Sequence, residues 1–400
     1  MDFVDGTLHR HASNVEKFFL HRGVELNESR VHSWICSAIK GNVKEIKLYL
    51  DQEHPLFIPL SLFTCESLIS LQLQTYPSIR LPKYISFPRL KCLEIADFVF
   101  SDRSWNEELF SNSPVLEELI LDHCKYRIRN FCISIPTLKL LRIDRDFTLN
   151  DLNDCALKID APSLVTFTYS ANVAKQYVLS SFPTLVEAVV CLDSPNNLAE
   201  ISRLLQALAH VKCLTVNDLT LQAICSAYDL SNNLLTFCNV KMLKISDILT
   251  TDQGLIALLK AVPTLESLEF VEYFSDEEEN SEVDEDGNDD AEGDGNDDNE
   301  DEGDVSDTDS WPLDIVTTGC LFPHLESVCF REIVGNPREL RWVKLILRNA
   351  KAWEMMTIRY YNTDLHFVNA KSEKELMVDI PSFPRASAES MTWKSTATGT

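Results

Sequence analysis

Few residues of this 400-residue chain stand at spacings that support catalysis or metal binding. The adjacent pair His123-Cys124 has the residue types of a thiol nucleophile and its base. Neighbouring side chains of a strand point to opposite faces, so these two cannot face each other. His9, His11 and His21 lie near the N-terminus without the spacing of zinc ligands. We therefore expect no catalytic residues, no metal site and no cofactor, in a protein that is not an enzyme.

One stretch matches a calcium-binding pattern in part. Asp290-x-Glu292-x-Asp294-Gly295 resembles the first half of an EF-hand loop. The twelfth position is Asp301 instead of glutamate, and no helical pattern flanks the stretch. Because any dense run of aspartate and glycine produces such matches, we interpret it as part of a charged loop.

That loop is the acidic segment Ser275–Ser310, which holds 20 of the 62 acidic residues and no lysine or arginine. It accounts for most of the net charge of −26, which argues against nucleic-acid binding. Few of its residues are apolar, so we expect disorder. It is either a solvated, self-repelling loop or a segment that attracts basic partners such as histone tails. Ser275, Ser281 and Ser306 each precede an acidic residue by three positions, which makes them candidate phosphorylation sites.

The rest of the composition bears on the compartment. The N-terminus lacks a basic region followed by an apolar run, and no stretch approaches the roughly 18 apolar residues of a membrane span. The twelve cysteines are scattered without a C-x-x-C pair, and Cys92, Cys191, Cys213 and Cys329 sit in apolar runs. We expect buried, reduced cysteines in a protein of the cytoplasm or nucleus, with no membrane partner.

A short pattern recurs along the chain: a leucine-type residue, two others, an apolar residue, one other and an apolar residue, often with a proline two residues earlier. Clear copies are Phe87-Pro-Arg-Leu-Lys-Cys-Leu-Glu-Ile95 and Ile135-Pro-Thr-Leu-Lys-Leu-Leu-Arg-Ile143. The lead residues are Val43, Leu68, Leu90, Leu116, Leu138, Leu164, Leu185, Val211, Val240, Leu265, Leu325 and Trp353. Their spacings are 21 to 29 residues with one exception, and this period is typical of leucine-rich repeats.

The exception is the spacing of 60 residues between Leu265 and Leu325. Setting aside the 36 residues of Ser275–Ser310 leaves 24, which restores the period. The acidic segment is therefore predicted to be a loop inserted into one repeat.

The pattern predicts an α/β fold, a horseshoe-like leucine-rich-repeat solenoid with a parallel sheet on its concave face and an internal disordered acidic insertion. Leu93 and Ile95 should point inward, and Cys92, Glu94 and Ala96 outward. Helices are expected over Leu198–Leu208, with Asn197 as N-cap, and over Asp252–Ala261. The repeats of 21 and 22 residues should use extended turns.

Solenoids often bind partners on the concave face, so outward residues of successive strands are the candidate partner-binding residues. These are Gln72, Glu94, Asp122, Arg142, Thr168, Thr215, Lys244, Glu269 and Arg331.

At this point the chain resembles the plant F-box/leucine-rich-repeat proteins that carry a C-terminal FBD module. The resemblance covers nearly the whole chain. Its motifs are Asp2-Phe-Val-Asp-Gly-Thr-Leu8, similar to the stretch that follows the F-box, then Val31-His-Ser-Trp-Ile-Cys-Ser-Ala-Ile39, Ile58-Pro-Leu-Ser-Leu-Phe-Thr-Cys-Glu-Ser-Leu-Ile-Ser-Leu71 and Ser113-Pro-Val-Leu-Glu-Glu-Leu119. Glu339–Ile358 and Phe383-Pro-Arg-Ala-Ser387 resemble the FBD module.

The resemblance implies a function. In that family the F-box binds the Skp-type adaptor of a cullin ubiquitin ligase, and the repeats recruit a substrate protein. This chain starts at the stretch that follows the F-box, so we expect the substrate-recruiting part without the F-box. Adaptor binding is then expected only if an F-box lies upstream. The alternative is a ligase-independent scaffold whose acidic segment binds basic nuclear proteins.

The expected domain organisation follows the repeats. Residues 1–42 form an N-terminal linker or cap, 43–274 the leucine-rich repeats, 275–310 the acidic insertion, 311–385 the last repeats and the FBD-like module, and 386–400 a flexible tail.

Overall fold

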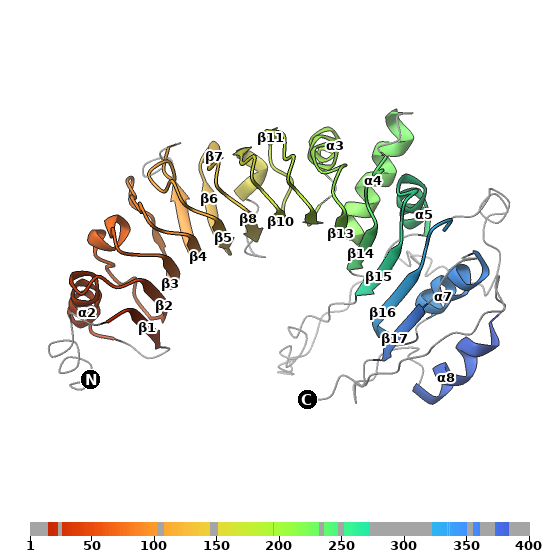
Figure 1. Ribbon diagram of the computed structural model, residues 1–400, viewed down its shortest axis with the longest axis horizontal. Coiled ribbons are helices and arrows are strands. Elements are labelled where there is room, and N and C mark those ends of the chain that lie inside the picture. The colour runs from red at the N-terminus through yellow and green to blue at the C-terminus, as the bar shows by residue number, and fades with distance from the viewer. Residues whose placement is uncertain are drawn as a thin grey trace, which may run out of the picture.

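The chain forms an arch in which one long parallel sheet lines the inner side, while helices and short strands cover the outer side (Figure 1). The computed structural model describes residues 15–22, 26–101, 108–144, 151–194, 196–231, 236–246, 252–271, 322–333, 335, 337–349, 355–360 and 373–383. This is the α/β leucine-rich-repeat solenoid that the period predicts.

Within the described residues the inner sheet has 14 strands, paired in the order β1-β2-β3-β4-β5-β8-β10-β12-β13-β14-β15-β16-β17, with β6 attached to β4. Their bounds are β1 Lys17–Arg22, β2 Glu45–Asp51, β3 Ser70–Arg80, β4 Cys92–Ser101, β5 Glu118–Asp122, β6 Lys125–Arg127, β8 Leu140–Asp144, β10 Thr166–Ala171, β12 Glu187–Leu192, β13 Cys213–Asn217, β14 Met242–Ser246, β15 Ser267–Val271, β16 Ser327–Ile333 and β17 Met355–Tyr360.

The buried side of this sheet is built by the repeat pattern. Every lead residue from Val43 to Leu325 is at most 4% exposed, and the apolar residues three and five positions later are buried as well. Trp353, the last lead residue, lies outside the described residues. Stacking these residues gives one continuous core, because each repeat alone leaves its apolar side uncovered.

One residue expected to be exposed on the outward side of β4 is buried. Leu93 and Ile95 point inward as predicted, but Ala96 is also buried. Asp97 has a left-handed backbone with φ of 65°, and the alternation of β4 shifts by one residue there, so Phe98 and Phe100 enter the core next.

The outer layer changes along the arch. Its helices are α2 Glu28–Lys40, α3 Leu198–Ala207, α4 Asp218–Ser231, α5 Asp252–Ala261, α7 Pro337–Asn349 and α8 Glu373–Ser382, with short 3-10 helices η2 Leu60–Thr64 and η3 Asp151–Asp154. In the middle, β7 Asn130–Ser134, β9 Ala156–Asp160 and β11 Gln176–Leu179 form a second parallel sheet. Strands β7 and β11 belong to the repeats of 22 and 21 residues, and each pairs with β9 of the 26-residue repeat between them.

The helix predicted after Asn197 is α3, and Ile201, Leu205 and Leu208 are buried on one face. Asn197 is the N-cap residue as predicted, but its side chain makes no capping hydrogen bond. Its left-handed backbone, with φ of 62°, turns the side-chain amide toward the carbonyl oxygen of Lys175 in the preceding repeat, 3.5 Å away.

The sheet begins earlier than the repeat pattern suggested. Strand β1 pairs in parallel with β2 and lies inside the range 1–42 that we assigned to a linker or cap. Val15, Phe18 and Leu20 have the spacing of the repeat and pack against the core, so this range contributes one more repeat-like strand.

The two sides of the acidic segment meet directly. Strands β15 and β16 pair in register from Ser267↔Ser327 to Val271↔Arg331, and the rings of Phe270 and Phe330 stack with centroids 4.6 Å apart. The insertion into a single repeat is therefore confirmed, although Ser275–Ser310 itself lies outside the described residues.

Candidate functional site: the concave sheet

The side chains that face the inside of the arch stand in rows, because the strands pair without offset. The central row, which we call the concave row, contains Phe19, Lys47, Gln72, Glu94, Ile120, Arg142, Thr168, Val189, Thr215, Lys244, Glu269, Cys329 and Thr357.

The structure brings most of the predicted partner-binding residues together. Gln72, Glu94, Arg142, Thr168, Thr215, Lys244 and Glu269 all belong to the concave row. Asp122 and Arg331 lie in the next row, where they pair with Ala96 and Val271. The matching residues of their strands are Ile120 and Cys329, which were not among the predicted residues; Lys47 and Val189 of the same row were not predicted either. Counting four residues on from each lead residue would have found them.

Charges near β5 and β8 are paired across strands. Arg142 lies 3.3 Å from Asp122 Oδ1 through Nε and 2.9 Å from Asp144 Oδ2 through an outer guanidinium nitrogen. Burial still raises the pKa of Asp122 above its ordinary value, with Arg142 acting in the opposite direction. Burial, followed by the negative charge of Asp122, also raises the pKa of Glu94.

A second ion-pair group stands near the other end of the row. Glu269 is only 7% exposed and lies between Lys244 and Arg331. The Lys244 ammonium is 3.4 Å from the carboxylate, and the Arg331 guanidinium contacts its other oxygen. A carboxylate buried to this extent needs such partners, because removing it from water is costly.

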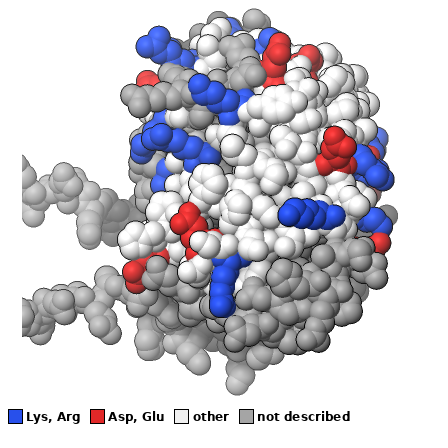
Figure 2. All heavy atoms as spheres, turned by 90° about the vertical axis from the view of Figure 1, so that its left-hand side faces the viewer, with Lys and Arg blue, Asp and Glu red and all other residues white. Residues whose placement is uncertain are grey.

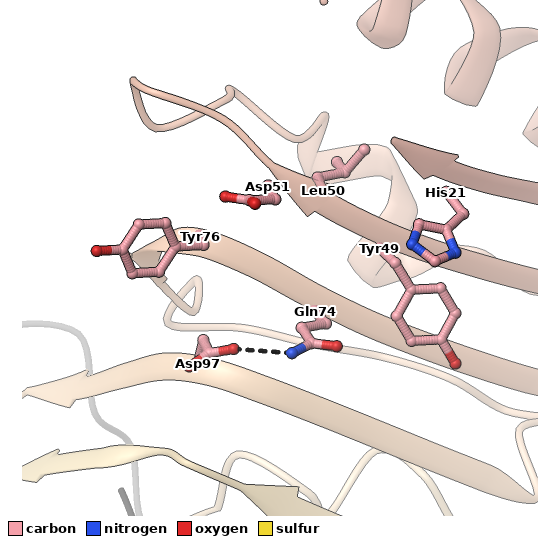
Figure 3. Close-up of a pocket in the computed structure, with 7 residues that line it drawn as sticks. All are labelled: His21, Tyr49, Leu50, Asp51, Gln74, Tyr76 and Asp97. Carbon is pink, nitrogen blue, oxygen red and sulfur yellow. Dashed lines mark hydrogen bonds between the residues drawn. The ribbon is translucent and has the colours of Figure 1, made fainter. Parts of the chain in front are cut away.

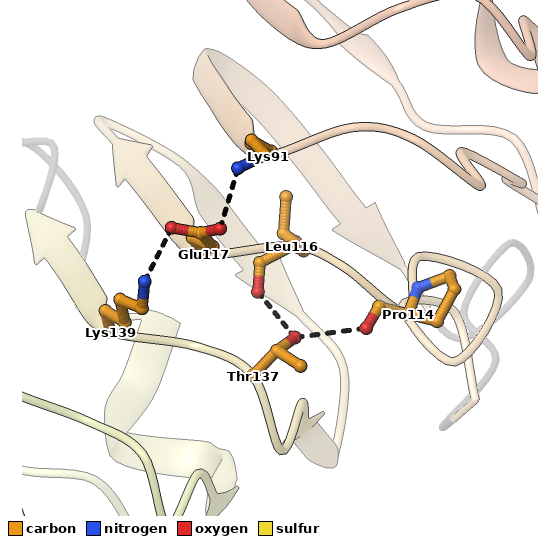
Figure 4. Close-up of polar contacts among 6 residues, drawn as sticks. All are labelled: Lys91, Pro114, Leu116, Glu117, Thr137 and Lys139. Atoms are coloured by element: carbon orange, nitrogen blue, oxygen red, sulfur yellow. Dashed lines mark hydrogen bonds and ion pairs between the residues drawn. The ribbon is translucent and has the colours of Figure 1, made fainter.

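Charged residues just before the strands form ion pairs between neighbouring repeats. Glu117 accepts hydrogen bonds from Lys91 at 3.1 Å and from Lys139 at 2.8 Å, which joins three consecutive repeats (Figure 4). Hydrogen bonds from Lys139 and then Lys91 lower the pKa of Glu117. Lys241 and Glu266 repeat the contact at 2.6 Å.

Between the two ion-pair groups the concave row is uncharged. Thr168, Val189 and Thr215 occupy three consecutive strands and form the longest uncharged run of the row. Val165 and Val186, at the start of two of these strands, are 39% and 38% exposed. The centre of the arch thus offers short side chains and accessible apolar surface, flanked by charges that already have partners.

A hollow lies at the carboxyl ends of β1 and β2 and beside the middle of β3 and β4. We call it the strand-end hollow; its lining residues are His21, Tyr49, Leu50, Asp51, Gln74, Tyr76 and Asp97 (Figure 3). Tyr49 donates a hydrogen bond to Gln72 Oε1 at 3.0 Å, and Gln74 donates one to Asp97 Oδ2 at 3.2 Å. The lining residues include two carboxylates and no lysine or arginine.

Viewed from the end that carries α2 and β1, the surface shows positive and negative side chains interspersed with a broad uncharged area (Figure 2). A nucleic-acid site requires clustered lysine and arginine along the path of the phosphates. This face offers a mixed surface of the kind that protein partners use.

The cysteines require a correction. Cys92, Cys191, Cys213 and Cys329, which we expected to be buried, are only partly buried because they occupy outward positions of their strands. Cys65, Cys124, Cys132 and Cys155 are the buried ones, and none of the ten cysteines whose side chains the structure describes forms a disulfide.

Cys124 does not act with His123 as a nucleophile pair. Its thiol donates to the carbonyl oxygen of Ile95 at 3.5 Å, and burial raises its pKa to about 12. A thiol with that pKa stays protonated and unreactive at neutral pH. Across the described residues there is no group of His, Cys, Asp and Glu that could hold a metal ion.

Other predicted features lie outside the described residues: the candidate phosphorylation sites Ser275, Ser281 and Ser306, the EF-hand-like stretch Asp290–Asp301, and His9 and His11. Among the described helices, none is both long and apolar enough to cross a bilayer.

Two family models match the chain. Residues 31–180 match the leucine-rich repeats of the FBD-associated F-box protein At5g56370, and residues 317–358 match FBD. The chain is 29% identical over 285 residues to the F-box/LRR-repeat protein At4g14096 and 28% identical over 292 residues to the F-box/LRR-repeat protein At4g14103, both from Arabidopsis thaliana. Each alignment covers 68% of this chain; they span 59% of the first relative and 74% of the second.

Proposed function

Because this chain belongs to the plant F-box/FBD/leucine-rich-repeat proteins, we propose that its concave sheet selects a protein for ubiquitination. The protein itself acts by binding, and the chemistry belongs to the ligase it would serve. One observation carries the proposal: the uncharged run Thr168, Val189 and Thr215 lies in the middle of an aligned concave row. Interface centres are depleted of charge and surrounded by a polar rim, and the concave row has this arrangement.

Adding bulk and charge to that run tests the binding surface. The double variant Thr168→Arg and Thr215→Arg would place two guanidinium groups where a partner must approach closely. The matched control is Ser134→Arg and Val178→Arg, which adds the same charges to the exposed side of the outer sheet. Proteins captured from plant tissue by the unaltered chain should fall by about tenfold or more with the concave variant and remain with the control. Equal capture by all three would reject the concave face.

The connection to a ligase is tested separately. The chain is co-precipitated with a Skp-type adaptor, and the abundance of a captured protein is followed after the chain is removed from the plant. Recovery of the adaptor together with accumulation of the captured protein would support substrate recruitment. A captured protein whose abundance does not change, with no adaptor recovered, would favour a scaffold that acts without the ligase.

That scaffold is the second candidate, and the composition of Ser275–Ser310 favours it, since 20 acidic residues and no basic ones attract cationic segments. Deleting these 36 residues should abolish binding of a Lys- and Arg-rich peptide if the segment is the binding element. In either case we propose that the protein acts in the cytoplasm or nucleus, where thiols stay reduced. The ten cysteines whose side chains are described, none of them in a disulfide, support this proposal, and a fluorescent fusion would test it.

A further inference from the structure

We propose that the strand-end hollow binds an arginine side chain of the protein held on the concave sheet. The inference rests on the proposed function, because it assigns a chemical group to one part of that partner. The hollow adjoins the concave row: Tyr49 and Gln74 stand two residues beyond Lys47 and Gln72 in the same strands. A partner lying along the row at β2 and β3 therefore reaches the hollow without leaving the sheet.

The charges of the hollow are available to a ligand. Asp51 is exposed, and within the described part of the chain no lysine, arginine or histidine pairs with its carboxylate or with that of Asp97. Asp97 accepts one hydrogen bond from the uncharged amide of Gln74. The carboxylates of the next two strands differ, since Asp122 and Asp144 share Arg142. Within the part of the chain that the structure describes, the hollow thus concentrates negative charge that has no ion-pair partner.

Aromatic rings complete the site. The ring of Tyr76 is 64% exposed, and the ring of Tyr49 packs against that of His21 with centroids 5.6 Å apart. Figure 3 shows Tyr76 at one end of the hollow, His21 and Tyr49 at the other, and Asp51 and Asp97 on its two flanks. A planar guanidinium can stack on a tyrosine face while its N–H groups reach a carboxylate, which a compact ammonium does less well.

Hydrogen bonds between strands hold the hollow in shape before any ligand binds. The hydrogen bond from Tyr49 to Gln72 and the one from Gln74 to Asp97 each join adjacent strands, which fixes two of its walls. Its volume of about 510 Å³ accommodates the end of an arginine side chain with water around it. Binding in a preformed site avoids the entropic cost of ordering the side chains that line it.

The test uses N-acetyl-arginine amide and its uncharged analogue N-acetyl-citrulline amide as probes of the full chain. The imidazole signals of His21, assigned by comparison with His21→Gln, report occupancy of the hollow by NMR. The arginine probe should give saturable shifts in the millimolar range, and the citrulline probe should bind about fivefold more weakly or not at all.

The double variant Asp51→Asn and Asp97→Asn should weaken arginine binding about fivefold. The control Asp154→Asn and Asp160→Asn removes two carboxylates from the outer sheet region and should leave binding unchanged. Asp51→Asn alone alters only an exposed side chain and should leave the fold intact. If the double variant does not fold, the loss of affinity for the arginine probe is measured with this single variant.

Equal binding of both probes, or unchanged arginine binding after the Asp51 and Asp97 substitutions, would overturn the inference. Such results leave the proposed function intact as long as capture of a partner still depends on Thr168 and Thr215. Loss of that dependence, with arginine still bound in the hollow, would instead count against the proposed function.

Discussion

The hydroxyl group of Thr137 donates a hydrogen bond to the carbonyl oxygen of Leu116, 2.8 Å away, and so joins two consecutive repeats (Figure 4). The same hydroxyl also reaches the carbonyl of Pro114 at 3.3 Å. Thr184 bonds to Leu164 at 2.8 Å and Thr264 to Val240 at 3.0 Å in the same way. In each case the threonine of a Pro-Thr-Leu motif satisfies the carbonyl of the preceding lead residue. The motif therefore connects repeats as well as starting strands.

Replacing these threonines by valine should destabilise the solenoid. Valine keeps the shape but removes the donor, so each of Thr137→Val, Thr184→Val and Thr264→Val should lower the free energy of unfolding by about 1 kcal/mol. Urea denaturation followed by circular dichroism measures the change. Thr168→Val on the concave face is the control and should have little effect. A similar loss in that control would show that the hydrogen bonds between repeats are not the cause.

Replacing Arg142 should change the pKa of the neighbouring carboxylates more clearly than it changes the stability of the fold. Arg142→Met leaves Asp122 and Asp144 facing each other, so the pKa of Asp122 should rise further above its ordinary value. Because Arg142 is about half exposed, the stability cost should stay near 1 kcal/mol at neutral pH. The double variant Arg142→Met and Asp122→Asn should recover part of it, and a thermodynamic cycle over the four proteins measures the coupling. Zero coupling would contradict the ion pair.

The contributions of Glu94 and Glu117 to folding stability should change in opposite directions when the pH is lowered. The lowered pKa of Glu117 means that its contribution to stability is complete above its ordinary pKa and disappears as the pH falls through the folded value. The raised pKa of Glu94 means that the folded chain binds this proton more readily than the unfolded chain, so acidification through that pKa favours folding. Carboxyl carbon NMR should show Glu94 titrating at the higher pH. Lys91→Met with Lys139→Met should raise the pKa of Glu117 and leave Glu94 unchanged.

The sequence was sufficient for the features that depend on spacing. Leu138 and its counterparts identify each strand, because only one register buries all three apolar residues of a repeat. The same count identifies the concave row. Asp122 and Arg331 were predicted to share this row, whereas the strand register gives those two places to Ile120 and Cys329. Position relative to the lead residue, and not residue type, decides which side chains share a row.

The contacts between different repeats could not be predicted from the residues of a single repeat. The pair Asp122 and Arg142 depends on β5 and β8 being neighbours, although β6 and β7 lie between them in the chain. The strand-end hollow depends on β3 and β4 continuing beyond their neighbours, with a register shift between Gln74 and Ile79. Strand β1 could have been found, since Val15, Phe18 and Leu20 follow the pattern, but Phe19 between them obscures the alternation.

The register of β15 with β16 predicts that the acidic segment can be removed without loss of the fold. Deleting Ser275–Ser310 leaves 272–274 and 311–326 to connect two strands that already pair directly. A connection shortened from 55 residues to 19 costs less closure entropy, so the free energy of unfolding should rise by about 1 kcal/mol. Phe270→Ala removes the ring that stacks on Phe330 and should instead cost about 3 to 5 kcal/mol. Thermal unfolding of both variants compares the two effects. A deletion variant as unstable as Phe270→Ala would show that the acidic segment is part of the folded structure and not a loop inserted into one repeat.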